Sequence, residues 1–98
     1  MPYLIETWDK PEHDAVRQAN RPAHLAWLEE NKTQLLACGA KMDDAGQRAQ
    51  GSFYIVDVDE RADAERFIAA DPFTLVGLPD RVMITRWRLA FLDRRSCL

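Results

Sequence analysis

The sequence predicts an α+β fold of the ferredoxin-like βαββαβ type, in which an antiparallel sheet carries two helices on one face. Three segments show the alternation of β-strands, a fourth is an apolar stretch that follows the first helix, and two others show the apolar spacing that is typical of helices. Their order is strand, helix, strand, strand, helix, strand, which is the split βαβ arrangement. A length of 98 residues fits one domain, so we expect residues 1–98 to form a single unit.

The strands are predicted over residues 3–9, 52–58 and 82–92, where the side chains alternate between two faces, and over residues 35–42, an apolar stretch after the first helix. Gly39 interrupts the second strand and indicates either a bulge or a close approach of another group. The polar residues 43–50 join the second and third strands and are typical of a hairpin loop.

The first helix is predicted to begin at Asn20-Arg21-Pro22 and to run to about Gln34, after a loop with one helical turn. Asparagine is a good helix cap, and proline is tolerated in the first turn because those amides have no partner within the helix. The second helix is predicted over residues 60–70, with Asp59 as its cap. Asp71-Pro72 then starts a short turn.

The sheet face that the helices leave open predicts a partner. Both prospective faces of the strands carry apolar side chains, and an uncovered apolar face indicates an interaction surface. The simplest partner is a second copy related by two-fold symmetry, so we expect a homodimer.

Composition excludes several classes of protein. The chain is 47% hydrophobic and 30% charged, as in an ordinary soluble domain. A net charge of −3 argues against binding to nucleic acid. No apolar run approaches the roughly 20 residues of a membrane span, and the first residues lack the features of a signal peptide. Cys38 and Cys97 have no metal or redox spacing, and free thiols favour a cytoplasmic location.

Neither a metal nor a cofactor is predicted. His13 lies between Glu12 and Asp14, but three adjacent residues cannot easily converge on one ion. The sequence has no glycine-rich phosphate loop, nucleophile elbow or dinucleotide fingerprint.

His24 and Asp71 are the candidate catalytic residues, because each titratable side chain lies beside a proline that fixes local backbone. A histidine has a reference pKa of about 6.5 and suits proton transfer, and a carboxylate can orient its ring. Two alternatives remain open. His24 can be a hydrogen-bonded histidine between helix and sheet, and Asp71 can be a helix cap. Asp71 can fill both roles, since a carboxylate has two oxygens.

Arg21, Ser52 and Phe73 are the candidate substrate-binding residues. Arg21 lies near the predicted helix start, where amide donors favour an anion. Ser52 can donate a hydrogen bond, and Phe73 can wall a pocket. The alternatives are a solvated or ion-paired arginine, an ordinary strand serine and a core aromatic residue.

The chain resembles the YciI-like family in several short stretches. These are Tyr3-Leu4-Ile5, Arg21-Pro22-Ala23-His24-Leu25, Gly39, Gly51-Ser52-Phe53, Ala69-Ala70-Asp71-Pro72-Phe73 and Gly77. The chain departs from shorter members in its loop at 43–50 and in a C-terminal extension from Asp93 to Leu98.

The resemblance implies a dimeric ferredoxin-like α+β fold related to the dimeric α/β-barrel group. It also implies that His24 and Asp71 match a histidine–aspartate dyad that is regarded as the active site. One relative is described as a dehydrochlorinase of a chlorinated hydroxyhydroquinone. We therefore hold two hypotheses: a cofactor-independent enzyme of lyase or isomerase type, and a non-catalytic dimeric binding or accessory module in which the dyad is a structural hydrogen bond.

Overall fold

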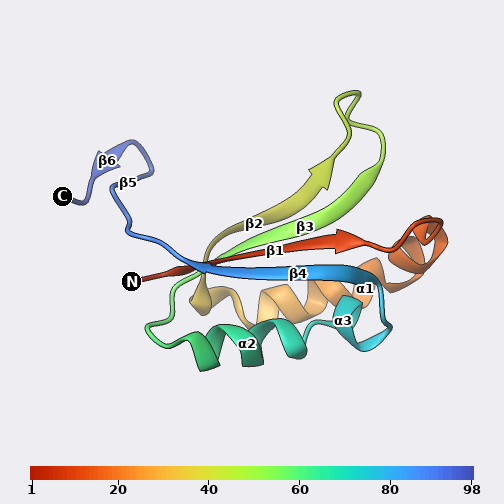
Figure 1. The fold of residues 1–98 in the computed structure, drawn as a ribbon, viewed down its shortest axis with the longest axis horizontal. Helices are drawn as coiled ribbons and strands as arrows, with labels where there is room; N and C mark the ends of the chain where they lie inside the picture. Colours follow the sequence, from red (N-terminus) through yellow and green to blue (C-terminus); the bar gives the residue numbers. More distant parts are fainter.

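The computed structural model describes residues 1–98 and has three helices on one face of a four-stranded antiparallel sheet (Figure 1). The strand order is β2-β3-β1-β4, so the predicted ferredoxin-like fold is confirmed. In chain order the elements are β1 (Tyr3–Asp9), α1 (Asp14–Glu30), the 3₁₀ turn η1 (Lys32–Gln34), β2 (Leu35–Met42), β3 (Ala49–Val56), α2 (Arg61–Ala69), α3 (Pro72–Leu75), β4 (Pro79–Arg86), β5 (Phe91–Leu92) and β6 (Arg95–Ser96).

Alternation along the strands separates a covered face from an open face. On β1, Tyr3 and Ile5 are buried toward the helices, whereas Leu4 and Trp8 are only partly buried on the opposite face. β2 has the predicted bounds. Gly39 is a site of close approach rather than a bulge, because a Cβ there would lie 3.2 Å from the ring of the neighbouring residue on β3.

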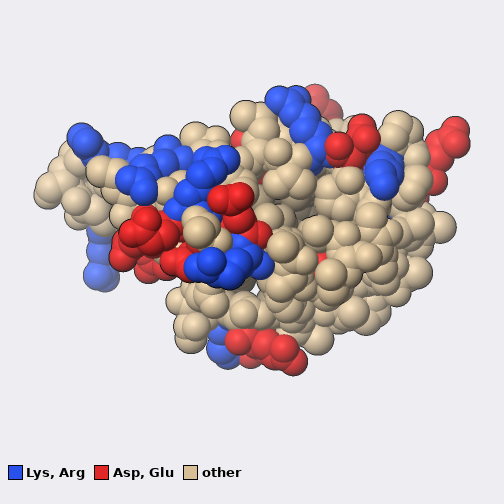
Figure 2. Space-filling model, turned by 60° about the horizontal axis from the view of Figure 1, so that its bottom comes forward, with Lys and Arg blue, Asp and Glu red and all other residues tan.

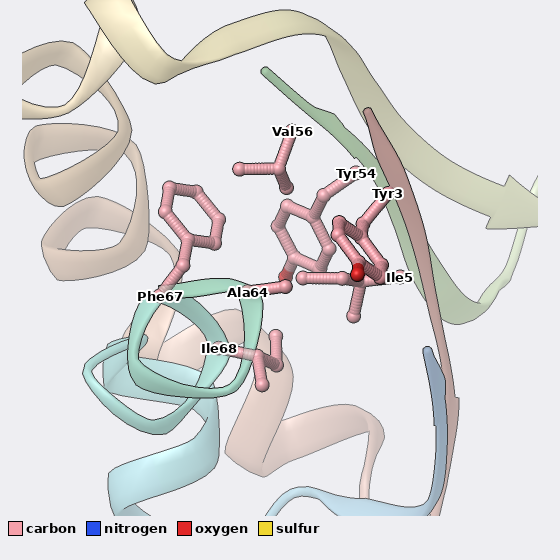
Figure 3. Close-up of a cluster of buried hydrophobic side chains, with 7 residues drawn as sticks. All are labelled: Tyr3, Ile5, Tyr54, Val56, Ala64, Phe67 and Ile68. Atoms are coloured by element: carbon pink, nitrogen blue, oxygen red, sulfur yellow. The ribbon is translucent and has the colours of Figure 1, made fainter. Parts of the chain in front are cut away.

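The core lies between the sheet and α2 (Figure 3). Its seven buried hydrophobic residues are Tyr3, Ile5, Tyr54, Val56, Ala64, Phe67 and Ile68. Burying a large apolar side chain contributes about 1.5–3 kcal/mol. These contacts fix α2 against β1 and β3, and thereby fix the start of α3, which follows α2 almost directly.

The first helix begins earlier than predicted, at Asp14, and Pro22 lies inside it. Asn20 is not a cap, since its side-chain amide donates to the Val16 carbonyl at 2.8 Å. An internal proline removes one helical hydrogen bond and costs about 3 kcal/mol. Good helix formers precede it, and Arg17 ties that part of α1 to the sheet. The helix ends at Glu30 rather than at Gln34.

The predicted N-terminal cap is wrong for α2 and correct for α3. Glu60, not Asp59, occupies the cap position of α2. The Asp59 carboxylate instead lies 3.4 Å from the N-terminal amino group. Asp71 caps α3 as predicted, because its side chain accepts the N–H of Phe73.

The last strand is also shorter at its C-terminal end than predicted, since β4 stops at Arg86. Arg86 pairs with Tyr3, the first residue of β1, so no neighbouring strand continues beyond it. The chain then leaves the sheet and forms a small hairpin, β5–β6, whose turn residues Asp93 and Arg94 have positive φ. Residues 87–98 are called the C-terminal arm below. None of the helices has the length and apolar character that crossing a membrane requires.

Candidate active site

The structure brings His24 and Asp71 into direct contact. His24 lies on α1 and Asp71 at the start of α3, and His24 Nδ1 lies 2.8 Å from Asp71 Oδ1. Because the carboxylate only accepts, the ring donates from Nδ1. The two residues are 8% and 0% exposed. The distance is within the range that proton transfer or ring orientation requires.

Asp71 binds three donors. Its Oδ1 accepts the Phe73 N–H at 3.0 Å as well as the His24 ring, and its Oδ2 accepts the Tyr54 hydroxyl at 2.5 Å. Burial raises the pKa of Tyr54, and the nearby Asp71 carboxylate raises it further, so the phenol remains a donor. The cap and the histidine contact that the sequence left as alternatives therefore coexist.

Phe73 fixes the plane of the His24 ring. The two rings stack with centroids 3.9 Å apart and planes 12° apart. His24 Nε2 makes no hydrogen bond within the chain, and it is not one of the buried polar atoms that lack a partner. Stacking and the Asp71 contact thus hold the ring while Nε2 stays accessible.

Arg17 is a site residue that the sequence analysis missed. Its Nε donates to Asp9 Oδ2 at 2.7 Å, and its Nη2 donates to Ser52 Oγ at 2.8 Å. The side chain is 7% exposed, and its guanidinium carbon lies 4.7 Å from the Phe73 ring centroid. Nη1 makes no hydrogen bond within the chain and is not buried without a partner.

The other predicted binding residues divide between the wall and the mouth of the site. Ser52 is buried beside Arg17, and its N–H donates to Thr7 Oγ1 at 3.0 Å. Phe73 is buried against the histidine. Arg21 is exposed and enters no hydrogen bond or ion pair, although it lines the pocket described next.

A pocket of about 190 Å³ opens onto His24 between α1, β2 and β3. Its lining residues are Arg17, Arg21, His24, Leu25, Leu28, Cys38, Gly39, Ala40, Ser52, Tyr54 and Phe73. A dry cavity of ~150 Å³ can hold a benzene-sized molecule, so a single substituted ring fits this volume. Two larger hollows, of about 290 and 330 Å³, have neither His24 nor Asp71 in their walls.

The cysteine and histidine side chains form no metal cluster. No group of three or more His, Cys, Asp or Glu residues could hold a metal ion. His13 instead contacts the Pro11 carbonyl through Nδ1 at 2.8 Å. Both cysteines are free. Cys38 is half-buried in the pocket wall, where burial raises the pKa of its thiol and Asp71 raises it further.

A comparison of the sequence with models of known protein families identifies the family of this chain. Residues 1–88 match the model of the YCII-related domain. The chain belongs to the YCII-related family. The resemblance to the YciI-like family is thereby confirmed. The match leaves out the last ten residues, which lie in the C-terminal arm.

Among solved structures, this chain resembles TftG, the 5-chloro-2-hydroxyhydroquinone dehydrochlorinase from Burkholderia phenoliruptrix AC1100. The TftG structure is a complex with 2,5-dihydroxybenzoquinone. The two are 32% identical with a TM-score of 0.84, over 90% of this chain and 94% of TftG.

More distant structures share only the fold. A proposed antibiotic biosynthesis monooxygenase from Bacteroides thetaiotaomicron VPI-5482 is 12% identical, with a TM-score of 0.58 over 98% of this chain and 94% of that one. The protein PA3566 from Pseudomonas aeruginosa is 18% identical, with a TM-score of 0.53 over 91% of this chain and 93% of that one. No curated protein sequence matches the chain.

The raised pKa of Tyr54 predicts a tyrosine that does not ionise while the protein is folded. In a Tyr3→Phe variant, Tyr54 is the remaining tyrosine, and its phenolate absorbance should stay low as the pH passes ~10, the reference pKa. A raised pKa stabilises the fold below the unfolded pKa, and this stabilisation is lost as the pH rises above it. Phenolate absorbance should therefore appear together with unfolding, and ionisation of a folded protein near pH ~10 would contradict the burial.

Proposed function

We propose that this protein is a small cofactor-independent enzyme of lyase or isomerase type that uses His24 and Asp71 for acid–base chemistry. Its substrate is a small oxygenated ring or enol, and the most specific candidate reaction is loss of HCl from a chlorinated hydroxyhydroquinone. The observation that carries the proposal is the pocket lined by His24, whose Nδ1 is held by Asp71 and whose Nε2 has no partner within the chain and is not buried. A sealed histidine would have no route to a substrate.

The pocket chemistry suits an oxygenated ring. Apolar side chains such as Leu28 and the Phe73 ring can contact its faces, and the Arg17 guanidinium offers an unpaired donor for a hydroxyl or oxyanion. Ser52 supports Arg17 by accepting from Nη2, and Arg21 at the mouth favours an anionic substrate. The likeness to TftG, which has a dihydroxybenzoquinone bound, supports the same substrate class.

The elimination can be written with balanced atoms. His24 Nε2 takes a proton from a ring hydroxyl, and the ring carbon that bears chlorine takes up a proton, which gives a keto tautomer. A second hydroxyl then loses its proton, and chloride leaves with the electron pair of the C–Cl bond. The net change is loss of HCl, and the ring becomes a quinone without an external oxidant. Asp71 stabilises the imidazolium that forms in the first step.

Chloride release tests this reaction directly. The wild-type protein is mixed with a chlorinated hydroxyhydroquinone, and free chloride is followed with an ion-selective electrode against a sample without protein. The proposal predicts stoichiometric chloride at a rate far above that in buffer, together with the absorbance of a hydroxyquinone. A rate equal to that in buffer would contradict dehydrochlorination as the activity.

The alternative function is a non-catalytic binding or accessory module. Asp71 favours it, because all its contacts hold parts of the chain together: α1 through His24, β3 through Tyr54 and α3 through its cap. This hypothesis predicts that ligands bind in the pocket unchanged. Conversion of any bound hydroxyhydroquinone by the wild-type protein, lost on replacing His24, would exclude it.

The proposal includes a homodimer that forms over the open face of the sheet. It also includes a location in the reducing cytoplasm, which suits the two free thiols. Leu4, Phe53, Ile55 and Met83 leave apolar surface on that face. Met83 is already exposed, so Met83→Asp should leave the fold intact and place a charge in the interface.

Sedimentation equilibrium measures this effect. We expect a wild-type dimer at micromolar concentration and a shift toward monomer in Met83→Asp. A wild-type protein that is monomeric throughout this range would contradict the homodimer.

A further inference from the structure

The C-terminal arm leaves the body of the molecule without a partner for its apolar side chains. Phe91 is 62% exposed, and Leu92 and Leu98 are also exposed. The arm's hydrogen bonds beyond its base are its own, such as the Cys97 N–H to the Ala90 carbonyl at 2.7 Å. An isolated two-stranded hairpin is marginally stable in water, so an ordered arm of this kind requires a surface to pack against.

The arm lies on the open side of the sheet. In Figure 1 the helices lie below the sheet, whereas the arm rises above it at one end and the β2–β3 hairpin rises above it at the other. The open face therefore lies between two projections. A body that sits on this face would contact the sheet below it and the arm beside it.

Two buried donors on the same side make no hydrogen bond within the chain, Lys41 Nζ and Trp87 Nε1. Lys41 Nζ does have an ionic partner, since it lies 3.9 Å from Glu6 Oε2, whereas Trp87 Nε1 has none. Lys41 lies on the open face, where its Nζ is 3.5 Å from the Trp8 ring centroid. Trp87 is at the base of the arm, next along the chain from Arg86. Leaving a buried donor unpaired costs about 1–3 kcal/mol, so the Trp87 Nε1–H favours a partner that carries an acceptor.

Charge identifies the kind of partner. The arm has three arginines (Arg88, Arg94 and Arg95) and one aspartate, so it is basic in a chain whose net charge is −3. The rest of the chain is therefore more acidic than the whole. Figure 2 shows acidic and basic side chains intermixed on the left of that view, with further charged groups along its upper and lower edges and an uncharged area at the lower right. A second copy of this chain offers both the acidic body and the acceptors that the arm lacks.

We propose that the C-terminal arm of each chain clasps a second copy seated on the open sheet face, with Phe91 and Leu92 packed against the partner. The inference rests on the homodimer proposed above, but the contact that it adds is made by Phe91 and Leu92, which lie outside the residues matched to the YCII-related family. Because the two copies are equivalent, each arm holds the other body, and the contact forms twice in one dimer.

The test compares dimer dissociation constants by sedimentation equilibrium of full-length proteins. The arm variant is Phe91→Asp with Leu92→Asp, and the matched control is Leu75→Asp, at a 73% exposed leucine on α3 on the helix side. We expect the arm variant to raise the dimer Kd at least about tenfold and the control to leave it unchanged. An unchanged Kd in the arm variant would overturn the clasp and leave the homodimer standing. A monomeric wild-type protein would overturn both.

Hydrogen exchange of the arm amides separates a clasp from an arm that folds onto its own sheet. In a clasp, protection of residues 90–97 rises with protein concentration as the dimer forms. Protection that is already complete at concentrations where the protein is monomeric would show that the arm packs on its own chain, and would overturn the proposal. Neither measurement depends on turnover, so a failed clasp is distinguishable from a failed enzyme.

Discussion

Replacing His24 by asparagine should lower kcat by about 10²–10⁴-fold, the usual contribution of a general acid or base. The asparagine amide can still donate to Asp71 from roughly the position of Nδ1, which keeps the contact at 2.8 Å in wild type. The variant lacks Nε2, the ring nitrogen that has no partner within the chain on this pocket-lining residue. KM should change much less than kcat, because the atom removed acts on the proton and does not hold the ring. Chloride release under saturating substrate measures the loss.

The other histidine provides the control. His13 lies in the loop before α1 and contacts only a backbone carbonyl through Nδ1, so His13→Asn should retain wild-type turnover. Circular dichroism and urea unfolding establish that both variants are folded. Turnover of His24→Asn within about threefold of wild type would remove His24 from the chemistry, since a general base contributes far more than this.

Replacing Asp71 by alanine should have the largest effect on stability of any single change in the site. The carboxylate accepts from the His24 ring, the Tyr54 hydroxyl and the Phe73 N–H, and it is fully buried. Alanine leaves these donors without an acceptor, and we expect unfolding free energy to fall by about 2–4 kcal/mol. Urea titration at neutral pH measures the difference.

Two further variants control for charge and for geometry. Asp59→Ala removes the same charge from an exposed side chain and should change stability by less than about 0.5 kcal/mol. Asp71→Asn keeps one oxygen and should lie between wild type and Asp71→Ala in stability. If Asp71→Ala were as stable as Asp59→Ala, the three hydrogen bonds would not hold α1, α3 and β3 together, and the orienting role of Asp71 would fail with them.

The sheet was predictable because side-chain alternation is a local signal. Residues 3–9 form a strand with the predicted bounds, as do residues 35–42, which the sequence indicates by an apolar run rather than by alternation. The pairing of β1 with β3 and β4 follows from the order of the elements. The open face was predictable for the same reason, since alternation assigns every second residue to each side. The contact of His24 with Asp71 was anticipated only as a possibility, because it joins residues 47 positions apart.

Arg17 was missed because the helix start was predicted at Asn20. With the observed start at Asp14, the spacing of Arg17, Arg21 and His24 is i, i+4, i+7, which places all three on one face of α1. That spacing was the available signal. The proline at 22 obscured it, since proline is typical of a first turn but is tolerated here inside the helix.

The end of the chain could not be predicted from alternation alone. Residues 82–92 alternate as a strand would, yet β4 ends at Arg86. The Trp87 N–H still donates to the Pro2 carbonyl at 3.2 Å, but Pro2 has no N–H with which to continue the ladder. Strand length depends on the neighbour as well as on the strand's own sequence. The tight turn at Asp93–Arg94 needs positive φ at two residues that are not glycine, and no local pattern indicated it.

The most direct test of the account is whether an oxygenated ring binds against His24. The chain has two histidines, so the ring-proton NMR signals of His24 and His13 can be followed together while 2,5-dihydroxybenzoquinone is added. The account predicts a saturable shift of the His24 signal and none of the His13 signal, with the His24 shift weakened in a Leu28→Asp variant of the pocket wall. A His24 signal that stays in place at saturating ligand, or that moves together with the His13 signal, would contradict the claim that this pocket is the active site.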